Sequence, residues 1–373
     1  MELQPTTQLQ QGKYSISKTL GKGGFGITYL GEQVALSRKV AIKEFFMSDC
    51  CSRESDSHSV TVTMPQKQGV VDEFKARFFK EARILAELKH PNIVNIIDVF
   101  EENNTSYYVM EHIEGSSLKK RMGNPMDEKE ASAIIKQVGN ALDYVHSHNI
   151  LHLDVKPDNI MMRNDGTPIL IDFGISKRYD ESGSQTSFST MGTSRGYAPI
   201  EQYNPDSLTT FRPATDIYAL GATFYFLLTG ENPPESNVVL SQGLPSLPSN
   251  VSKDTKIAIT AAMRPSRADR PQTVTQFLAM LSGEVADVNT TAPSNMRYLI
   301  EQLEANKQYK QAYNLCIDCI EQGKDVEFAQ EKSKEYVKLI MKKSYSTNTI
   351  LVTIGIVIVI AISILAVVLQ INI

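Results

Sequence analysis

The chain has 373 residues, a formal net charge of −4 and a pI near 5.9. Its length exceeds the roughly 250–300 residues at which one hydrophobic core stops growing, so two or three domains are expected. The slightly acidic balance excludes a broad basic surface for nucleic acid, and we expect no nucleic-acid partner. Residues 1–12 lack the apolar run of a signal peptide, and the 4 cysteines are too few for a disulfide framework. A reducing, cytoplasmic compartment is favoured.

The first expected element is a hairpin of two strands over residues 14–30, around the glycine-rich turn 20–26 (LGKGGFG). Glycines let backbone N–H groups approach phosphate oxygens, although the pattern alone also fits an ordinary glycine-rich turn. Val40-Ala41-Ile42-Lys43 follows on the next strand but one, and its lysine favours the phosphate-binding alternative.

The segment 44–71 is polar and long, and we expect a mobile surface insertion. Its vicinal Cys50 and Cys51 are either redox-sensitive or, as we favour, two ordinary thiols. Residues 74–88 show helical periodicity, and Glu81 lies on this helix. A glutamate on an amphipathic helix is usually solvated, so Glu81 alone indicates no site.

Two motifs carry the chemistry of the chain. Residues 152–159 (HLDVKPDN) and 171–174 (IDFG) place carboxylates, a lysine and a carboxamide on one loop and one turn. Phosphoryl transfer needs metal ligands, a group that orients the attacking hydroxyl, and cations over the phosphate oxygens. An amphipathic helix over 127–147, with Ile134, Val138, Leu142 and Val145 on one stripe, is expected to support this loop.

In this order, the glycine-rich turn, the VAIK strand, the HLDVKPDN loop and the DFG turn resemble those of the protein kinase family. The resemblance covers residues 14–281 and implies an α+β, bilobal protein kinase fold that uses ATP and Mg²⁺, with Mn²⁺ as an alternative. It divides the chain into an N-terminal tail (1–13), an N-lobe (14–111), a hinge (111–115) and a C-lobe (116–281). Lysine two residues after the loop aspartate resembles the Ser/Thr-kinase form of the loop.

The resemblance also implies roles for individual residues. Asp154 would orient the substrate hydroxyl, and Lys156 would neutralise the transferring phosphate. Lys43 would bind phosphates and pair with Glu81, while Asn159 and Asp172 would hold the metal. Met110 would be the gatekeeper, and the backbone of Glu111 and Ile113 would bind adenine. The implied ATP-binding residues are Leu20, Gly21, Gly23, Gly24, Phe25, Gly26, Thr28, Ala41, Lys43, Met110, Glu111, Ile113 and Met161, with Thr28 where the family usually has valine.

One departure from the family pattern bears on regulation. Leu153 stands where an arginine usually binds an activation-segment phosphate, and leucine cannot bind phosphate. We therefore hypothesise that activity depends little on phosphorylation of the segment 172–201. Its candidate autophosphorylation sites are Ser184, Thr186, Ser187, Ser189 and Thr190, although any flexible loop can have this composition.

Three further features of the C-lobe follow from the resemblance. Gly192-Thr193 and residues 196–201 resemble the end of the activation segment. Glu201 would pair with Arg270 in a buried ion pair. Asp216 would open a core helix and brace the catalytic loop.

Residues 282–295 are expected to be a linker. Residues 296–343 are expected to form helices over 296–305, 309–322 and 327–342, in a hairpin similar to one tetratricopeptide unit. One such unit cannot bury its apolar face alone, so it would pack on the kinase, a partner or a second copy. Cys316 and Cys319 fit helical core positions better than a metal or redox site, because no second cysteine or histidine pair accompanies them.

Residues 350–369 form an apolar run of 20 residues, long enough to cross a bilayer. We expect a single transmembrane helix rather than a buried core helix. Lys338, Lys342 and Lys343 precede the run and place residues 1–345 in the cytoplasm. The protein would be tail-anchored, without an outer sensor domain.

Taken together, we expect a membrane-anchored, bacterial-type serine/threonine protein kinase whose partners are protein substrates and the membrane. The alternatives are a pseudokinase scaffold that binds nucleotide without turnover, and a kinase-like enzyme acting on a small molecule. The intact set Lys43, Glu81, Asp154, Asn159 and Asp172 disfavours the scaffold, and the peptide-docking type of segment at 192–201 disfavours a small-molecule substrate.

Overall fold

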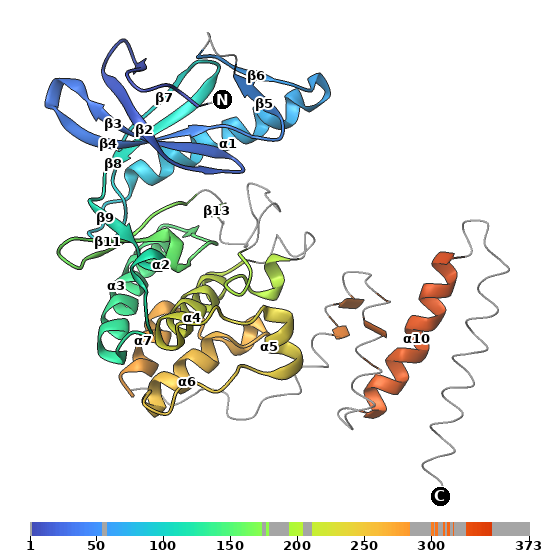
Figure 1. Cartoon of the computed structure of the whole chain (residues 1–373). Coiled ribbons are helices and arrows are strands. Elements are labelled where there is room, and N and C mark those ends of the chain that lie inside the picture. Colours follow the sequence, from blue (N-terminus) through green and yellow to red (C-terminus); the bar gives the residue numbers. More distant parts are fainter. Residues whose placement is uncertain are drawn as a thin grey trace, which may run out of the picture. The chain divides into compact units, whose positions relative to one another are not determined.

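The computed structural model describes residues 2–53, 58–173, 177–178, 194–203, 211–283 and 326–344, with single positions between 300 and 316. The chain divides into two compact units, Met1–Val288 and Asn289–Ile373. The first unit has a sheet-rich lobe and a helical lobe joined by one strand-to-strand connection (Figure 1). The predicted α+β, bilobal architecture is confirmed.

A six-stranded antiparallel sheet in the order β1-β2-β3-β4-β8-β7 forms the N-lobe. The bounds of its strands are β1 Gln8–Leu9, β2 Tyr14–Gly23, β3 Gly26–Gln33, β4 Arg38–Phe45, β7 Ile96–Glu102 and β8 Thr105–Glu111. The predicted hairpin is β2–β3, and its turn lies between Gly23 and Gly26. Gly26 is needed for a close approach, because a Cβ there would lie 2.7 Å from the carbonyl oxygen of Glu44.

The helix α1, Gln68–Glu87, covers this sheet and begins earlier than the sequence periodicity predicts. Ala82, Leu85 and Leu88 of its predicted apolar face are buried, at 1%, 5% and 2% exposure. The segment before α1 differs from the mobile insertion that was expected. Its described part forms the hairpin β5 Cys51–Arg53 and β6 Val60–Val62, followed by η2 Pro65–Lys67, and it buries both Cys50 and Cys51.

The C-lobe is built around α3, Glu128–Ser147, close to its predicted bounds. Asp127 caps this helix by accepting a hydrogen bond from the backbone N–H of Lys129 over 2.9 Å. The four residues of its predicted stripe are at most 4% exposed and pack in one core with α4, Pro213–Thr229, which is buried on nearly every side. The core therefore lies directly beneath the loop that follows α3.

The smaller elements of the C-lobe position loops around this core. They are β9 Gly115–Ser117, α2 Leu118–Arg121, β10 Ile150–Leu151, η3 Pro157–Asn159, β11 Ile160–Arg163, β12 Pro168–Leu170, β13 Lys177–Arg178, η4 Ile200–Gln202, α5 Ser236–Gln242, α6 Lys253–Ala262, η6 Arg267–Asp269 and α7 Val274–Leu281. In the sheet β12-β11-β9, the end of the hinge pairs with β11, the strand that follows the catalytic motif. The helix α7 ends at Leu281, where the sequence predicts that the domain closes.

The second unit includes α10, Val326–Ser344, which spans the third predicted helix. Cys316 is helical and buried beside Ile300, Ala329 and Tyr336, so its assignment as a core cysteine is confirmed. Among the described residues, none of the helices has the length and apolar character that a bilayer span requires. The predicted span 350–369 lies outside those residues, as do Cys319 and most of the predicted linker.

Candidate active site

The loop after β10 brings the predicted catalytic residues together. The Nζ of Lys156 donates to Oδ2 of Asp154 over 2.7 Å, and the Nδ2 of Asn159 donates to the same oxygen over 2.8 Å. Asn159 is held by a second bond from its Nδ2 to the Asp154 carbonyl, 2.9 Å away. The carboxylate of Asp154 thus has a fixed orientation, as a group that must aim at a hydroxyl requires.

Ser194 is a site residue that the sequence analysis did not identify. Its hydroxyl donates to Oδ1 of Asp154 over 2.6 Å and accepts from the Nζ of Lys156 over 2.7 Å. The sequence pattern pointed instead to Gly192-Thr193, which lie outside the described residues. Adjacent hydroxyl residues look alike in a sequence, so the fold is needed to show that Ser194 contacts Asp154.

Asp216 braces the loop from the core, as predicted. Its carboxylate accepts the backbone N–H groups of His152 and Leu153 over 2.9 and 2.7 Å, and lies 2.8 Å from Nε2 of His146. Leu153 has a left-handed backbone with φ of 64°, which costs roughly 1–2 kcal/mol for a residue with a Cβ. The two charge-assisted bonds offset this cost.

The side chain of Leu153 is only 4% exposed and forms an apolar cluster with Leu151 and Phe211. In addition, its carbonyl accepts a hydrogen bond from Nε2 of Gln202 over 2.8 Å. The position at which the family usually has an arginine is therefore part of a small core that offers no cation to a phosphate.

Lys43 on β4 and Asp172 after β12 form a direct ion pair between the two lobes. Burial by itself would lower the pKa of Lys43, but the Asp172 carboxylate outweighs this effect and raises it. The same charge pair holds the pKa of Asp172 below its usual range. Glu81 lies in α1, but its side chain is outside the described part, so its pairing with Lys43 stays a prediction.

The oxygen donors that would hold a metal are those of Asn159 and Asp172. Mg²⁺ prefers such oxygen ligands and usually completes its shell with water and phosphate. The Asp172 side chain is 44% exposed, and no described residue donates to Oδ1 of Asn159. The donor set fits Mg²⁺, although the described residues contain no cluster of three or more His, Cys, Asp or Glu that could form an all-protein cage.

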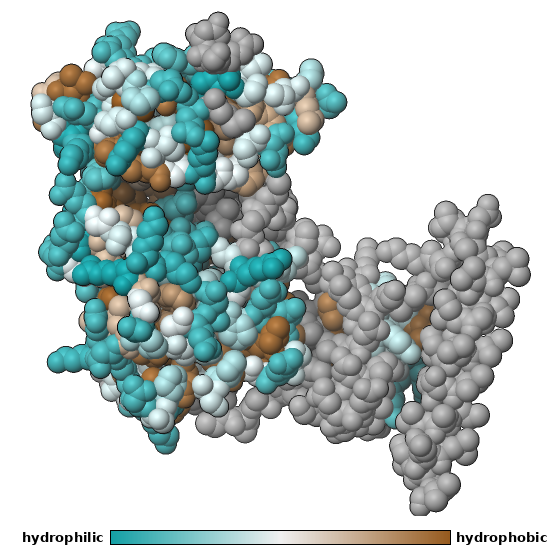
Figure 2. Space-filling view, in the orientation of Figure 1, coloured by the Kyte–Doolittle hydropathy of each residue, from teal (hydrophilic) through white to brown (hydrophobic). Residues whose placement is uncertain are grey.

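The expected adenine pocket lies where the hinge meets β11. Met110 and Met161 pack against the buried Ile113 in one apolar cluster, and Figure 2 shows hydrophobic residues in the recess between the lobes. Thr28 is paired with Lys43, and Ala41 with Met110, in the sheet register. The remaining predicted ATP-binding residues lie on β2, on the β2–β3 turn or on the hinge, so the fold brings the predicted set to one region.

The hinge is held by the side chain of Glu111. Its Oε1 accepts the Asn95 N–H over 3.0 Å, and its Oε2 accepts from Nη2 of Arg163 over 2.5 Å. Asn95 precedes β7 of the N-lobe, and Arg163 ends β11 of the C-lobe. One carboxylate therefore links both lobes at the expected adenine-binding backbone.

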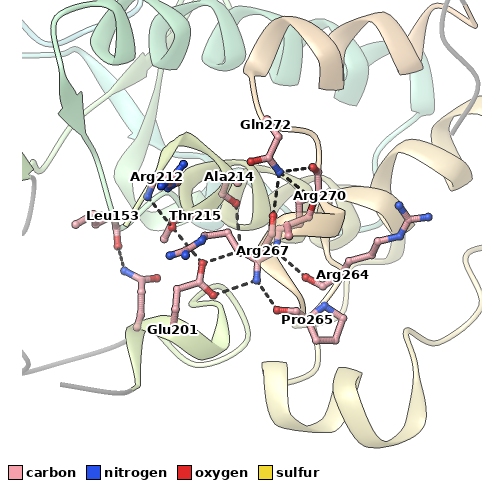
Figure 3. A network of polar contacts seen from close by, with 12 residues as sticks. Leu153, Glu201, Arg212, Ala214, Thr215, Arg264, Pro265, Arg267, Arg270 and Gln272 are labelled. Carbon is pink, nitrogen blue, oxygen red and sulfur yellow. Dashed lines mark hydrogen bonds and ion pairs between the residues drawn. The ribbon is translucent and has the colours of Figure 1, made fainter. Parts of the chain in front are cut away.

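Behind the site, Glu201 and Arg270 form the predicted buried ion pair (Figure 3). Two parallel bonds join them, Nη1 to Oε1 at 2.7 Å and Nη2 to Oε2 at 3.0 Å. The guanidinium is further held by the carbonyls of Arg264, Pro265 and Ala214, and Thr215 donates to Glu201 over 3.1 Å. The pair anchors the end of the activation segment to α4 and to the loop before α7.

Comparison with known proteins agrees with this geometry. A solved structure described as "PpkA-294 apo form" superposes with a TM-score of 0.64 at 27% identity, covering 75% of this chain and 99% of that one. The probable serine/threonine-protein kinase PknB of Lactococcus lactis is 35% identical over 59% of this chain and 32% of its own length. The serine/threonine-protein kinase PrkC of Bacillus subtilis is 34% identical over 63% of this chain and 33% of its own length.

The chain therefore spans about a third of the length of these two curated relatives. The family model of the protein kinase domain matches residues 14–343, which is most of the sequence. With the match over that range and the catalytic loop in its expected geometry, the chain belongs to the protein kinase family.

Proposed function

We propose that the chain is a serine/threonine protein kinase that transfers the γ-phosphoryl group of ATP to hydroxyls of protein substrates. The observation that carries this proposal is the hydrogen-bonded group of Asp154, Lys156 and Asn159, together with the Lys43–Asp172 ion pair. The relatives' names, which specify serine/threonine kinases, support the substrate class.

Each residue has a definite task in this reaction. Asp154 accepts a hydrogen bond from the substrate hydroxyl and orients its oxygen toward the γ-phosphorus. Lys156 is positioned to neutralise charge on the transferring group, and Lys43 to bind the phosphates of the nucleotide. Mg²⁺, held by Asn159 and Asp172, would offset the charge of the phosphate oxygens.

The test is phosphate transfer by the full-length chain. It should be incubated with radiolabelled ATP and Mg²⁺, alone and with a generic basic protein, followed by phosphoamino-acid analysis. Label on serine or threonine that is lost in Asp172→Ala and in Asp154→Asn supports the proposal. Nucleotide binding without transfer would instead identify a pseudokinase scaffold.

We further propose that residues 350–369 anchor the protein in a membrane with the kinase domain in the cytoplasm. Support comes from the apolar run of 20 residues and from the lysines that precede it. Autophosphorylation in the segment 184–190 and self-association through residues 296–343 are further proposals. The test is alkaline extraction of membranes. The anchor is supported if the full-length chain stays in the membrane while a chain that ends at residue 349 is extracted.

A further inference from the structure

The segment 2–13, which the sequence suggests is a tail, packs on the N-lobe. We call it the N-terminal strap. Leu3 and Leu9 are 3% and 0% exposed in the core of that lobe. The backbone N–H of Thr6 donates to the Ile16 carbonyl over 2.8 Å, and β1 pairs with β2. The strap is therefore a structural part of the lobe that contains the glycine-rich turn.

The first described residue of the strap reaches the glycine-rich turn itself. The Glu2 carboxylate forms an ion pair with Lys22, which lies between Gly21 and Gly23. It also accepts a hydrogen bond from Oγ1 of Thr19 over 2.5 Å. These contacts lower the pKa of Glu2, with the hydrogen bond from Lys22 as the largest cause, so the group is an anion at neutral pH.

The next residue of the strap is tied to the strands behind the turn. The Leu3 N–H donates to the Tyr29 hydroxyl over 3.2 Å, and that hydroxyl donates to Oε2 of Glu44 over 2.8 Å. Tyr29 belongs to β3, and Glu44 follows Lys43 on β4. Glu2 is thus held in place by Leu3, whose backbone is linked through Tyr29 to both β3 and β4.

On its β2 side, the turn is held by backbone pairing of Gly21, Lys22 and Gly23 with β3, which leaves the side chain of Lys22 free to be positioned by other contacts. Carbonyls of Gly24 and Phe25 accept N–H groups of Ser48 and Phe46 over 3.4 and 3.1 Å, and the Phe25 ring stacks on Phe74 of α1 at 5.5 Å between centroids. These contacts fix the tip and the β3 side. Among the described residues, Glu2 supplies the side-chain ion pair on the β2 side.

We propose that Glu2 is a positioning residue of the nucleotide site, which holds Lys22 and Thr19 so that the glycine-rich turn is ordered for the phosphates of a nucleotide. Glu2 does not touch the nucleotide. It orders the turn before the ligand binds, so the turn loses less conformational entropy on binding. The effect therefore appears only for ligands whose phosphates contact the turn. The identity of that ligand as ATP rests on the proposed function.

The experiment measures binding of MgATP and of adenosine to the full-length chain by calorimetry. In Glu2→Gln, the Kd for MgATP should rise about three- to fivefold, which is the upper range for the loss of one part-exposed ion pair. The Kd for adenosine should stay within twofold. In transfer assays, KM for ATP should rise while kcat stays within twofold.

The matched control is Glu32→Gln, which removes an exposed carboxylate at the far end of β3 and should change neither Kd. Glu2→Lys should weaken MgATP binding further than Glu2→Gln, since it adds repulsion of Lys22. An unchanged Kd for MgATP in Glu2→Gln would overturn the proposal, as would an equal loss for adenosine. The binding experiment does not require phosphate transfer. A wild-type protein that binds MgATP but transfers no phosphate would therefore refute the proposed kinase activity and leave the proposal for Glu2 open to the same binding test.

Discussion

The hydroxyl of Ser194 lies 2.6 Å from Oδ1 of Asp154 and 2.7 Å from Nζ of Lys156. It connects the end of the activation segment to both residues that are assigned to the substrate hydroxyl and the phosphate. Since Tyr197 and Ala198 also bond back to the Ser194 carbonyl, over 3.0 and 2.9 Å, this serine is fixed from two directions.

Replacing Ser194 by alanine should lower kcat about tenfold, because Asp154 and Lys156 would each lose a hydrogen bond that fixes their position. KM for ATP should stay within twofold. Ser194→Thr keeps the hydroxyl and should retain most of the activity. Steady-state kinetics of the two variants measure the difference, and equal losses in both would show that the hydroxyl is not the cause.

Arg270→Ala should destabilise the protein by about 3–5 kcal/mol, because Glu201 would remain buried without its partner. The guanidinium is fully buried, and its two bonds to Glu201 are 2.7 and 3.0 Å long. Urea denaturation gives the free energy of unfolding. Arg38→Ala, at an exposed position, is the control and should cost under about 0.5 kcal/mol.

The same pair predicts a dependence of stability on pH. Burial alone would raise the pKa of Glu201, but the Arg270 charge outweighs it and holds the pKa below the ordinary value of 4.5. A depressed folded-state pKa contributes stability that is present above the unfolded value and is lost as the pH falls through the folded value. The free energy of unfolding should therefore drop below about pH 4.5, and more steeply in wild type than in Glu201→Gln.

Arg53→Ala should cost about 3–5 kcal/mol of stability, although Arg53 belongs to a segment that the sequence suggests is a mobile insertion. Arg53 pairs with Glu44, which is 0% exposed and also accepts the Tyr107 hydroxyl over 2.6 Å. Urea denaturation measures the decrease in the free energy of unfolding. The double variant Glu44→Leu with Arg53→Met should be more stable than Arg53→Ala, because no charge is left buried alone.

The Leu153 cluster predicts how activity responds to phosphorylation. Leu153, Leu151 and Phe211 form a buried apolar group at the position where the family usually has an arginine. Phosphatase-treated and autophosphorylated protein should therefore transfer phosphate at rates within about threefold of each other. A difference of tenfold or more would refute the hypothesis.

Much of the site could be predicted because its chemistry lies in short motifs. Asp154, Lys156 and Asn159 are neighbours in the chain, so their sequence spacing already places them on one loop. Asp216 and Arg270 were predictable only through the resemblance, since their partners lie 63 and 69 residues away.

What the sequence did not predict depends on partners that no local pattern identifies. The strap has a polar composition, and its buried residues Leu3, Thr7 and Leu9 form no continuous apolar run. The insertion was expected to be mobile because it is polar, but Arg53 finds its buried partner in Glu44, on another strand. Pairing between strands changes the burial of a polar segment without leaving a periodic signal in the sequence.

The carboxylate of Glu111 has a consequence for inhibitor design. Because it accepts hydrogen bonds from Asn95 and from Arg163 at once, protein contacts hold the hinge backbone in place. An inhibitor that binds this backbone would not have to order it first, so little binding free energy would be lost. Rigid aromatic compounds should gain most from such a preorganised surface. Weakening the link, for example with Arg163→Ala, would then reduce the residence time of rigid inhibitors more than that of flexible ones.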